Sequence, residues 1–209
     1  MMRKKINFET WNRKDHFNFF NQMEEPFHGV CVNLDCTLAY RKAKDMNVSF
    51  FSFYLHKTLR AVNEIENFRY RIIDDDVYVF DCIDASATVL RSDKTFGFSY
   101  VPFTADLLAF DALLKIEMAR IETTTGIFTT DYPDNLIHFS VLPWLHFTSL
   151  SHARSFSWPD SCPKISFGKM ISILNQKVMP VSVHVHHGLV DGYHVGLFLN
   201  RLQELFDEQ

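Results

Sequence analysis

Apolar side chains alternate with polar or small ones along residues 178–185, next to a run of histidines. A period of two puts successive side chains on opposite faces of a strand, so this stretch predicts a buried β-strand. After Gly192 the apolar residues recur every three or four positions as far as Leu205, which predicts an amphipathic helix. Residues 183–192 are therefore expected to form the end of a strand, a turn closed by Gly192 and the entry to a helix.

The same two periods divide the rest of the chain. Helical spacing predicts three more helices, over about 10–22 with Thr10 or Asn12 as the N-cap, over 50–66, and from Thr104 or Asp106 to about 122. Alternation and turn residues predict strands at 30–37, 85–91, 96–102, from 137 onward and at 164–169, and a hairpin of 69–73 with 77–80. Residues 123–134 are expected to form a loop. Together these elements predict an α/β (α+β) fold, a mixed β-sheet covered by helices, in a single domain over residues 1–209.

Composition agrees with a globular chain that has an aromatic interior. The 209 residues are 47% hydrophobic and 22% charged, and 21 phenylalanines predict a Phe-rich core or oligomer interface. A net charge of −4 gives no basic footprint for nucleic acid. No apolar run reaches membrane-spanning length, and no apolar stretch follows the basic residues at the N-terminus, so neither a membrane segment nor a signal peptide is expected. Four scattered cysteines without a C-x-x-C pair predict reduced thiols in a cytoplasmic protein.

The histidine run carries the candidate chemistry. A histidine in an apolar strand is most often a hydrogen-bonded core residue. A metal site is disfavoured, because His184 and His186 share one face of the strand while His187 points to the other, and no Cys or Glu stands nearby. An imidazole at a strand end, with Asp191 four residues beyond His187, instead suits a general base and a group that fixes its surroundings.

The pattern His-His-x-x-x-Asp-Gly at 186–192 resembles the chloramphenicol acetyltransferase family, and residues 194–205 continue the likeness. The catalytic domains of dihydrolipoyl acyltransferases carry a similar signature. Three further markers of the first family stand in its order: Trp-x-Arg-x-x-His-Phe at 11–17, Leu-Pro-Trp-x-x-Phe-x-Ser at 142–149, and residues 164–169, similar to its Ile-Thr-x-x-Lys stretch. Four ordered markers over nearly the whole chain are far more specific than the histidine motif alone.

The resemblance implies direct transfer of acetyl from acetyl-CoA to a hydroxyl, without an acyl-enzyme and without a metal. It implies that His187 is the general base, with its tautomer held by its own backbone carbonyl, that Ser149 donates to the oxyanion, and that Ser166 supports the intermediate through water. Arg13 is implied to form a buried ion pair with Asp191 that holds the turn around His187. The implied substrate-binding residues are Phe20, Phe96, Phe139 and Trp144, and the implied CoA-binding residues are Lys169 and Phe51. Family members are homotrimers with active sites at subunit interfaces.

The chain departs from the family pattern at its substrate and CoA walls. Phe20 stands where chloramphenicol-handling members have a Tyr, and Ser49 replaces a Lys that lies near CoA in the family. Phe51 replaces the neighbouring Tyr, and Met170 follows Lys169 where the family often has a Tyr. The expected acceptor is therefore chloramphenicol or a related small alcohol. Two alternatives stay open: an acyltransferase for a non-antibiotic hydroxyl acceptor, and a non-catalytic trimer that binds a small molecule in the same pocket.

Overall fold

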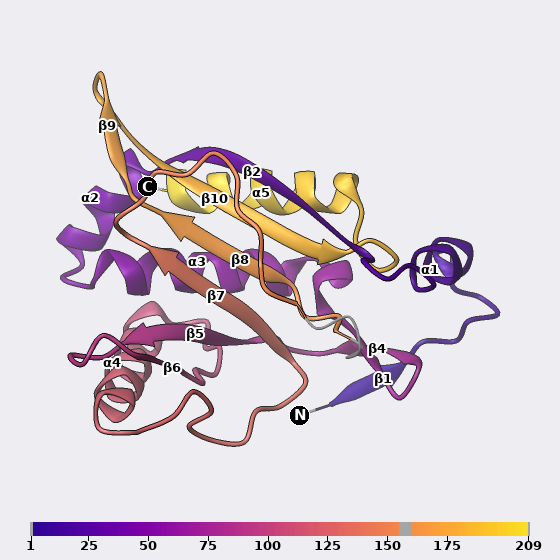
Figure 1. Ribbon diagram of the computed structural model, residues 1–209. Helices are drawn as coiled ribbons and strands as arrows, with labels where there is room; N and C mark the ends of the chain where they lie inside the picture. The colour runs from indigo at the N-terminus through magenta and orange to yellow at the C-terminus, as the bar shows by residue number, and fades with distance from the viewer. Residues whose placement is uncertain (1, 155–159, 209) are drawn as a thin grey trace.

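A mixed β-sheet forms the centre of the molecule. The computed structural model describes residues 2–154 and 160–208. Seven strands pair in the order β2-β10-β8-β7-β5-β6, with β9 beside β10 (Figure 1). Their bounds are β2 Phe27–Asp35, β5 Asp84–Leu90, β6 Phe96–Phe98, β7 Leu136–Leu142, β8 Lys164–Gly168, β9 Ile171–Ile173 and β10 Gln176–His186. The pairs β5–β7 and β7–β8 are parallel and the other pairs antiparallel, which confirms the predicted mixed sheet.

Helices cover one face of this sheet, as Figure 1 shows. They are α2 (Thr37–Asp45), α3 (Phe50–Glu64), α4 (Leu107–Glu122) and α5 (Gly192–Asp207). The odd-numbered residues of β10 pack into the core beneath them, and Val181, Val183 and Val185 are 0% exposed. Burying each such side chain contributes roughly 1.5–3 kcal/mol. The core is rich in phenylalanine, as composition predicts: Phe53, Phe68, Phe110, Phe139, Phe167, Phe198 and Phe206 are almost completely buried.

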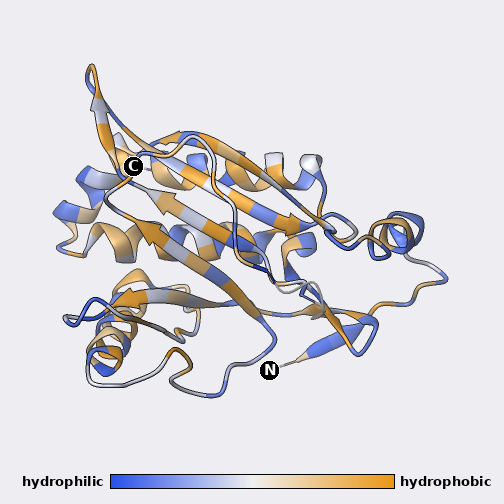
Figure 2. Ribbon diagram, in the orientation of Figure 1, coloured by the Kyte–Doolittle hydropathy of each residue, from blue (hydrophilic) through white to orange (hydrophobic). Residues whose placement is uncertain are grey.

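The opposite face of the sheet is polar near its middle. Ser182 and His184 of β10 lie there, beside Ser166 of β8. Residues 143–154, which follow β7, run across this face in Figure 1. The central strands are largely apolar in Figure 2, whereas the short strand β1 (Arg3–Lys5) is hydrophilic. No helix among the described residues is long and apolar enough to cross a membrane.

A smaller unit joins the N-terminal segment to the body. In it β1 pairs with β4 (Asp76–Phe80), and β4 pairs with β3 (Tyr70–Ile73) as the predicted hairpin. A 3-10 helix over Glu66–Arg69 precedes β3, and α1 (Lys14–Phe20) leads from β1 toward β2. Figure 1 shows α1 beyond the end of β10, on the side where the histidine run lies.

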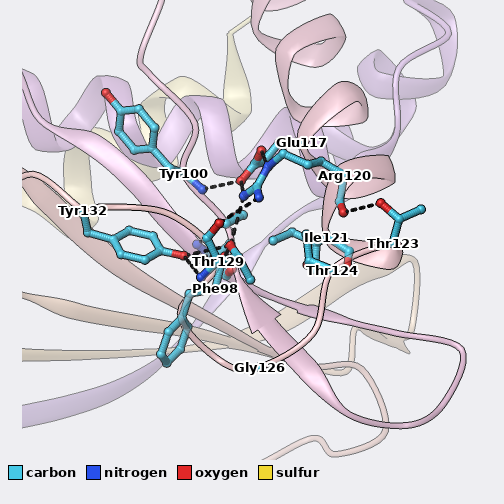
Figure 3. Close-up of polar contacts among 12 residues, drawn as sticks. Phe98, Tyr100, Glu117, Arg120, Ile121, Thr123, Thr124, Gly126, Thr129 and Tyr132 are labelled. Atoms are coloured by element: carbon cyan, nitrogen blue, oxygen red, sulfur yellow. Dashed lines mark hydrogen bonds and ion pairs between the residues drawn. The ribbon is translucent and has the colours of Figure 1, made fainter.

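The predicted loop between α4 and β7 is tied down by side chains. Arg120 of α4 donates to the carbonyl and the hydroxyl of Thr129, and the Tyr132 hydroxyl donates to the carbonyl of Phe98 (Figure 3). Glu117 accepts from Arg120 and from the backbone of Tyr100. The loop therefore holds the edge strand β6 in place although it has no secondary structure of its own.

Several element boundaries differ from the prediction, three of them as follows. The first helix begins only at Lys14, and its N-cap, Arg13, makes no side-chain capping bond because its guanidinium points elsewhere. The strand predicted to reach 37 ends at Asp35, whose carboxylate accepts from the backbone and hydroxyl of Thr37 and so turns the chain into the unpredicted helix α2. The strand β6 ends at Phe98, and only Val101 beyond it bridges back to Ala85.

Candidate active site

His187 follows the last residue of β10 directly. Its backbone N–H donates to the carbonyl of Pro26 at 2.8 Å, which extends the pairing of β10 with β2 by one step beyond His186 and Phe27. The next residues turn back at once, since the N–H groups of Leu189 and Val190 both donate to the carbonyl of His186. The predicted order of strand end, turn and helix entry is confirmed.

Arg13 and Asp191 form the expected ion pair. Arg13 Nη1 lies 2.8 Å from Asp191 Oδ2, and the Arg13 side chain is 9% exposed. The same guanidinium also donates to the carbonyls of His187, at 3.3 Å, and Gly188, at 3.4 Å. One cation thus holds three points of the turn that carries His187, and these charge-assisted bonds offset the cost of burying the guanidinium.

Asp191 is at the same time the N-cap of α5. Its Oδ1 accepts from the backbone N–H groups of Tyr193 and His194, at 3.0 and 3.4 Å, and the His194 ring completes a capping box. Burial opposes ionisation of this carboxyl, but the hydrogen bond from Arg13 and the charges of His194 and Arg13 outweigh it and lower the pKa of Asp191 to about 2. The residue is therefore a fixed anion near neutral pH.

The His187 imidazole is held between aromatic rings. The Phe20 ring stacks on it with centroids 3.9 Å apart and planes 5° from parallel, and the His28 ring lies 4.3 Å away. The Nδ1 atom of His187 is buried and makes no hydrogen bond to another residue among those described. A partner for that atom within the residue itself, its own carbonyl, is what the family resemblance implies.

Two neighbouring histidines, His186 and His28, bind backbone groups of the turn around His187. Burial lowers the pKa of His186 to about 4, and its Nδ1 accepts from the backbone of Gly188 at 3.2 Å, so it is a neutral core residue. His28 bonds to the carbonyl of Val190 at 3.2 Å, and burial lowers its pKa despite that bond. Sequence reasoning did not find His28, because only the register of β2 against β10 brings it beside His187.

A second group of candidate residues lines two connected hollows. The outer hollow, of about 580 Å³, is bordered by Phe51, Trp144 and Lys169, and the inner hollow, of about 350 Å³, by Trp144, Phe96 and Ser166. Thr88, Leu90, Val141 and Trp144 border both. Hollows of this size and lining hold small molecules. The predicted acceptor and CoA residues thus share one continuous space, apart from Phe20 and Phe139.

The Phe139 side chain lies on the core side of the sheet. It is 1% exposed and packs in the core on the helix side, because β7 turns odd-numbered residues such as Ile137 to that face. The even-numbered neighbour Ser140 borders the inner hollow instead. Phe139 also borders a smaller hollow of about 300 Å³ together with Phe96, Ser140 and His152, although its side chain lies almost entirely in the core.

Ser166 and Ser149 do not meet His187 within the chain. Ser166 pairs with Ser182, five residues before His187, which at about 3.3 Å per residue places them roughly 16 Å apart. The Ser166 hydroxyl is buried and lies 3.4 Å from His152 Nε2. Ser149 is exposed in the segment after β7. Among the described residues, no hydrogen bond connects its side chain with His187. The chain thus holds the His187 imidazole at one end of β10 and the inner hollow with Ser166 further along the sheet.

The outer hollow, which holds the predicted CoA-binding residues, has largely apolar walls. Its walls include Phe51, Tyr54 and Met179, and Lys169 is exposed at its border. Ser49, which stands where the resemblance expects a lysine, caps α3 by accepting from the backbone of Ser52 at 3.0 Å. Within the described part of the chain, no three His, Cys, Asp or Glu side chains are grouped to hold a metal ion. The four cysteines are free thiols.

The fold and the histidine turn together define a class of protein. A solved structure titled as a probable dihydrolipoamide acetyltransferase from Listeria monocytogenes superposes with a TM-score of 0.64 at 14% identity, over 98% of this chain and 94% of that one, and so shares the fold. A solved chloramphenicol acetyltransferase superposes with a TM-score of 0.87 at 30% identity, over 98% of this chain and all of that one. The architecture is that of the CoA-dependent acyltransferases.

Sequence comparison narrows the class to one family. The profile described as "Chloramphenicol acetyltransferase" matches residues 1–203. Chloramphenicol acetyltransferase 3 of Escherichia coli is 29% identical over 96% of this chain and 95% of its own length. The chloramphenicol acetyltransferase of Staphylococcus aureus is 29% identical over 97% of this chain and 95% of its own. The chain belongs to the chloramphenicol acetyltransferase family, whose members are acyltransferases.

Proposed function

We propose that this protein transfers the acetyl group of acetyl-CoA to a hydroxyl of chloramphenicol or of a related small alcohol. The observation that carries the proposal is the support of His187, whose backbone is pinned by Arg13 and Pro26 while its ring is stacked on Phe20. An imidazole fixed in this way holds its proton-accepting nitrogen in one orientation, as a general base requires. A protein that only binds its ligand has no use for this arrangement.

His187 accepts the proton of the acceptor hydroxyl while the hydroxyl oxygen attacks the thioester carbonyl. Ser149 donates to the oxygen that becomes negative, and one such donor is worth about 3 kcal/mol, or two orders of magnitude in rate. As the tetrahedral intermediate collapses, the bond to sulfur breaks and the imidazolium returns its proton to the leaving thiolate. The acetyl group passes directly between the two substrates.

The serines reach His187 from a neighbouring copy in this proposal. Ser166 is roughly 16 Å from His187 along the sheet of its own chain, too far for a shared substrate atom. In a homotrimer with sites between subunits, the inner hollow of one copy faces His187 of the next. Each site then has the base from one subunit and Ser149 and Ser166 from another.

The decisive experiment is a thiol-release assay with acetyl-CoA and chloramphenicol. We expect turnover by the natural protein and a loss of about a thousandfold or more in kcat for His187→Ala, since general bases contribute about 10²–10⁴. His16→Ala is the matched control, because His16 is exposed on α1 and should leave kcat unchanged. Equal rates for natural protein and His187→Ala would exclude the proposed base.

A non-antibiotic acceptor is favoured by one observation. Phe20 gives no hydroxyl to the acceptor, while His152 brings an imidazole to the inner hollow beside Ser166. His187-dependent thiol release with other small alcohols, but none with chloramphenicol, would establish this second function. Chloramphenicol turnover would instead support a role in antibiotic resistance in the cytoplasm, where free thiols such as these persist.

A further inference from the structure

Three basic side chains stand in one row across the polar face of the sheet. His138 of β7 lies in register with Lys164 of β8, and Lys164 lies in register with His184 of β10. We call these three residues the basic row. Neighbouring strands are about 4.8 Å apart, and like charges opposite each other on such strands destabilise a sheet. Negative charge close to the row would therefore stabilise it.

A row of hydroxyls lies beside the basic row on the same strands. Ser140 is in register with Ser166, and Ser166 with Ser182. Ser166 follows Lys164 by two positions on β8, so it lies on the same face about 7 Å away. Along this strand the order is therefore Lys164, then Ser166, then Lys169 at the border of the outer hollow.

The carboxylate of Asp160 lies beside the basic row. It accepts from the Lys164 ammonium group and lies 3.8 Å from Arg154 Nε. Arg154 also pairs with Glu25, whose side chain is 46% exposed to solvent. Asp160 thus offsets part of the positive charge, which leaves room for a singly charged anion rather than a dianion.

A buried cation adds to the positive potential at this end of β7. Arg71 of β3 is 2% exposed and donates to the carbonyls of Phe68, Tyr70 and Leu136. Leu136 begins β7, two residues before His138. Among the described residues no carboxylate forms an ion pair with Arg71. Burying a cation without a counter-ion costs free energy, so an anion bound nearby would be favoured.

The basic side chains of this cluster affect each other electrostatically. The His152 ring packs edge-on against that of His184, with centroids 4.9 Å apart. Burial, and then the positive charges of its basic neighbours, lower the pKa of His152 to about 4. Burial also lowers the pKa of His184, whereas the charge of Cys162 raises the pKa of His138. A bound anion would relieve the repulsion among these rings.

The basic row opens into the proposed acceptor space. The small hollow of about 300 Å³ is bordered by His138, Lys164 and His152. Four residues border both the small hollow and the inner hollow: Thr88, Phe96, Ser140 and His152. No aspartate or glutamate is among the described residues that border either of them. A ligand with its hydroxyl at Ser166 in the inner hollow can therefore extend into the small hollow.

We propose that the acceptor alcohol carries a carboxylate, which binds in the small hollow between His138, His152 and Lys164. This rests on the proposed function, and it names the chemical class of the acceptor. The reacting hydroxyl lies beside Ser166, about 7 Å from the carboxylate. The apolar body between them packs on Phe96, whose side chain is partly exposed.

The test compares two acceptors that differ in charge, 4-(hydroxymethyl)benzoate and its methyl ester, in the thiol-release assay with acetyl-CoA. We expect kcat/KM of the natural protein to be about tenfold higher for the carboxylate, as hydrogen bonds to a charged group provide. His138→Gln/His152→Gln should remove most of this preference and leave turnover of the ester nearly unchanged. His16→Gln is the matched control and should keep the preference.

The outcomes separate this proposal from the proposed function. His187-dependent turnover of chloramphenicol or of the ester, without a preference for the carboxylate, would overturn the charged acceptor and leave the acetyltransferase intact. No His187-dependent release with any of the three acceptors would overturn both. A preference that His138→Gln/His152→Gln keeps in full would place the carboxylate elsewhere and overturn the site. If that variant does not turn over the ester, Lys164→Met/Asp160→Asn, which removes one charge of each sign, takes its place with the same expected loss.

Discussion

At the scale of single residues, Asp191 joins three tasks in one carboxylate. One oxygen caps α5, the other accepts from Arg13, and the pair fixes the carbonyl of His187 through the same guanidinium. An asparagine could cap the helix as well as an aspartate does. The negative charge is needed only as the counter-ion of the buried Arg13. A substitution can therefore remove the ion pair and keep the helix cap.

The substitution Asp191→Asn should make the free energy of unfolding depend less on pH in the acidic range. The pKa of Asp191 is about 2 in the folded protein against an ordinary 3.8, so its ionised form stabilises the fold above about pH 4, and this contribution is lost as the pH falls through 2. Near neutral pH we expect the free energy of unfolding of the variant to be about 1–3 kcal/mol lower. Arg13 then still donates to the carbonyls of His187 and Gly188 but has lost its counter-ion.

Urea denaturation at one protein concentration, from neutral pH down to about 2, measures both effects. The free energies of unfolding of natural protein and variant should converge as the pH falls. Parallel curves over this range would show that Asp191 titrates normally in the folded state. Asp191→Ala, which also loses the cap, should cost about 1 kcal/mol more at every pH.

At the scale of elements, the pairing of β2 with β10 depends on one missing side chain. Gly29 lies opposite His184, and a Cβ at Gly29 would overlap the His184 ring. That ring is held in turn by the Ser182 hydroxyl, 3.2 Å from its Nδ1, and by the edge of the His152 ring. The close approach links β2, β10 and the segment that crosses the sheet.

Gly29→Ala should therefore destabilise the protein by about 1–3 kcal/mol through crowding. Adding His184→Ala should recover part of that loss, because the ring that blocks the new methyl group is gone. A double-mutant cycle on urea denaturation measures this coupling, which we expect to be about 1 kcal/mol. Additive losses would mean that His184 moves aside without cost.

These elements also show how far the sequence determines the site. The grouping of Arg13, Asp191 and His187 was predictable, because each stands in a marker motif. The face on which Phe139 lies could also have been predicted, since it shares the parity of the buried Ile137. His28 could not, because it reaches His187 only through the β2–β10 register, which no local pattern encodes. The turn at Asp35 and Thr37 was missed because apolar alternation continued up to it.

At the scale of the whole molecule, the His187 imidazole lies at one end of the sheet and the Ser166 hydroxyl near its middle. The strands β7 and β8 are parallel, and β10 runs against them, so His187 emerges at the end where β8 begins. The outer hollow lies at the opposite end, bordered by Gly168 and Lys169. Activity should therefore depend on assembly as well as on folding.

Mixing two inactive variants tests that dependence. His187→Ala and Ser149→Ala should each lose at least about 10²-fold in kcat. Co-refolded in equal amounts, they should recover up to about one quarter of natural activity, since random cyclic assembly gives that fraction of sites an intact base and an intact serine. Each variant refolded alone is the control. Co-refolded trimers with no recovery would mean that each chain builds its site alone.

The Arg13–Asp191 contact joins residues 178 positions apart, and so has a consequence for the order of folding. Contacts of such long sequence separation bear the greatest loop-closure entropy and tend to form late. The core of β7, β8 and β10 under α3 can form while the segments that carry Arg13 and Asp191 are still apart. We therefore expect the turn that carries His187 to become native late in folding, and to be among the first parts lost when the protein begins to open.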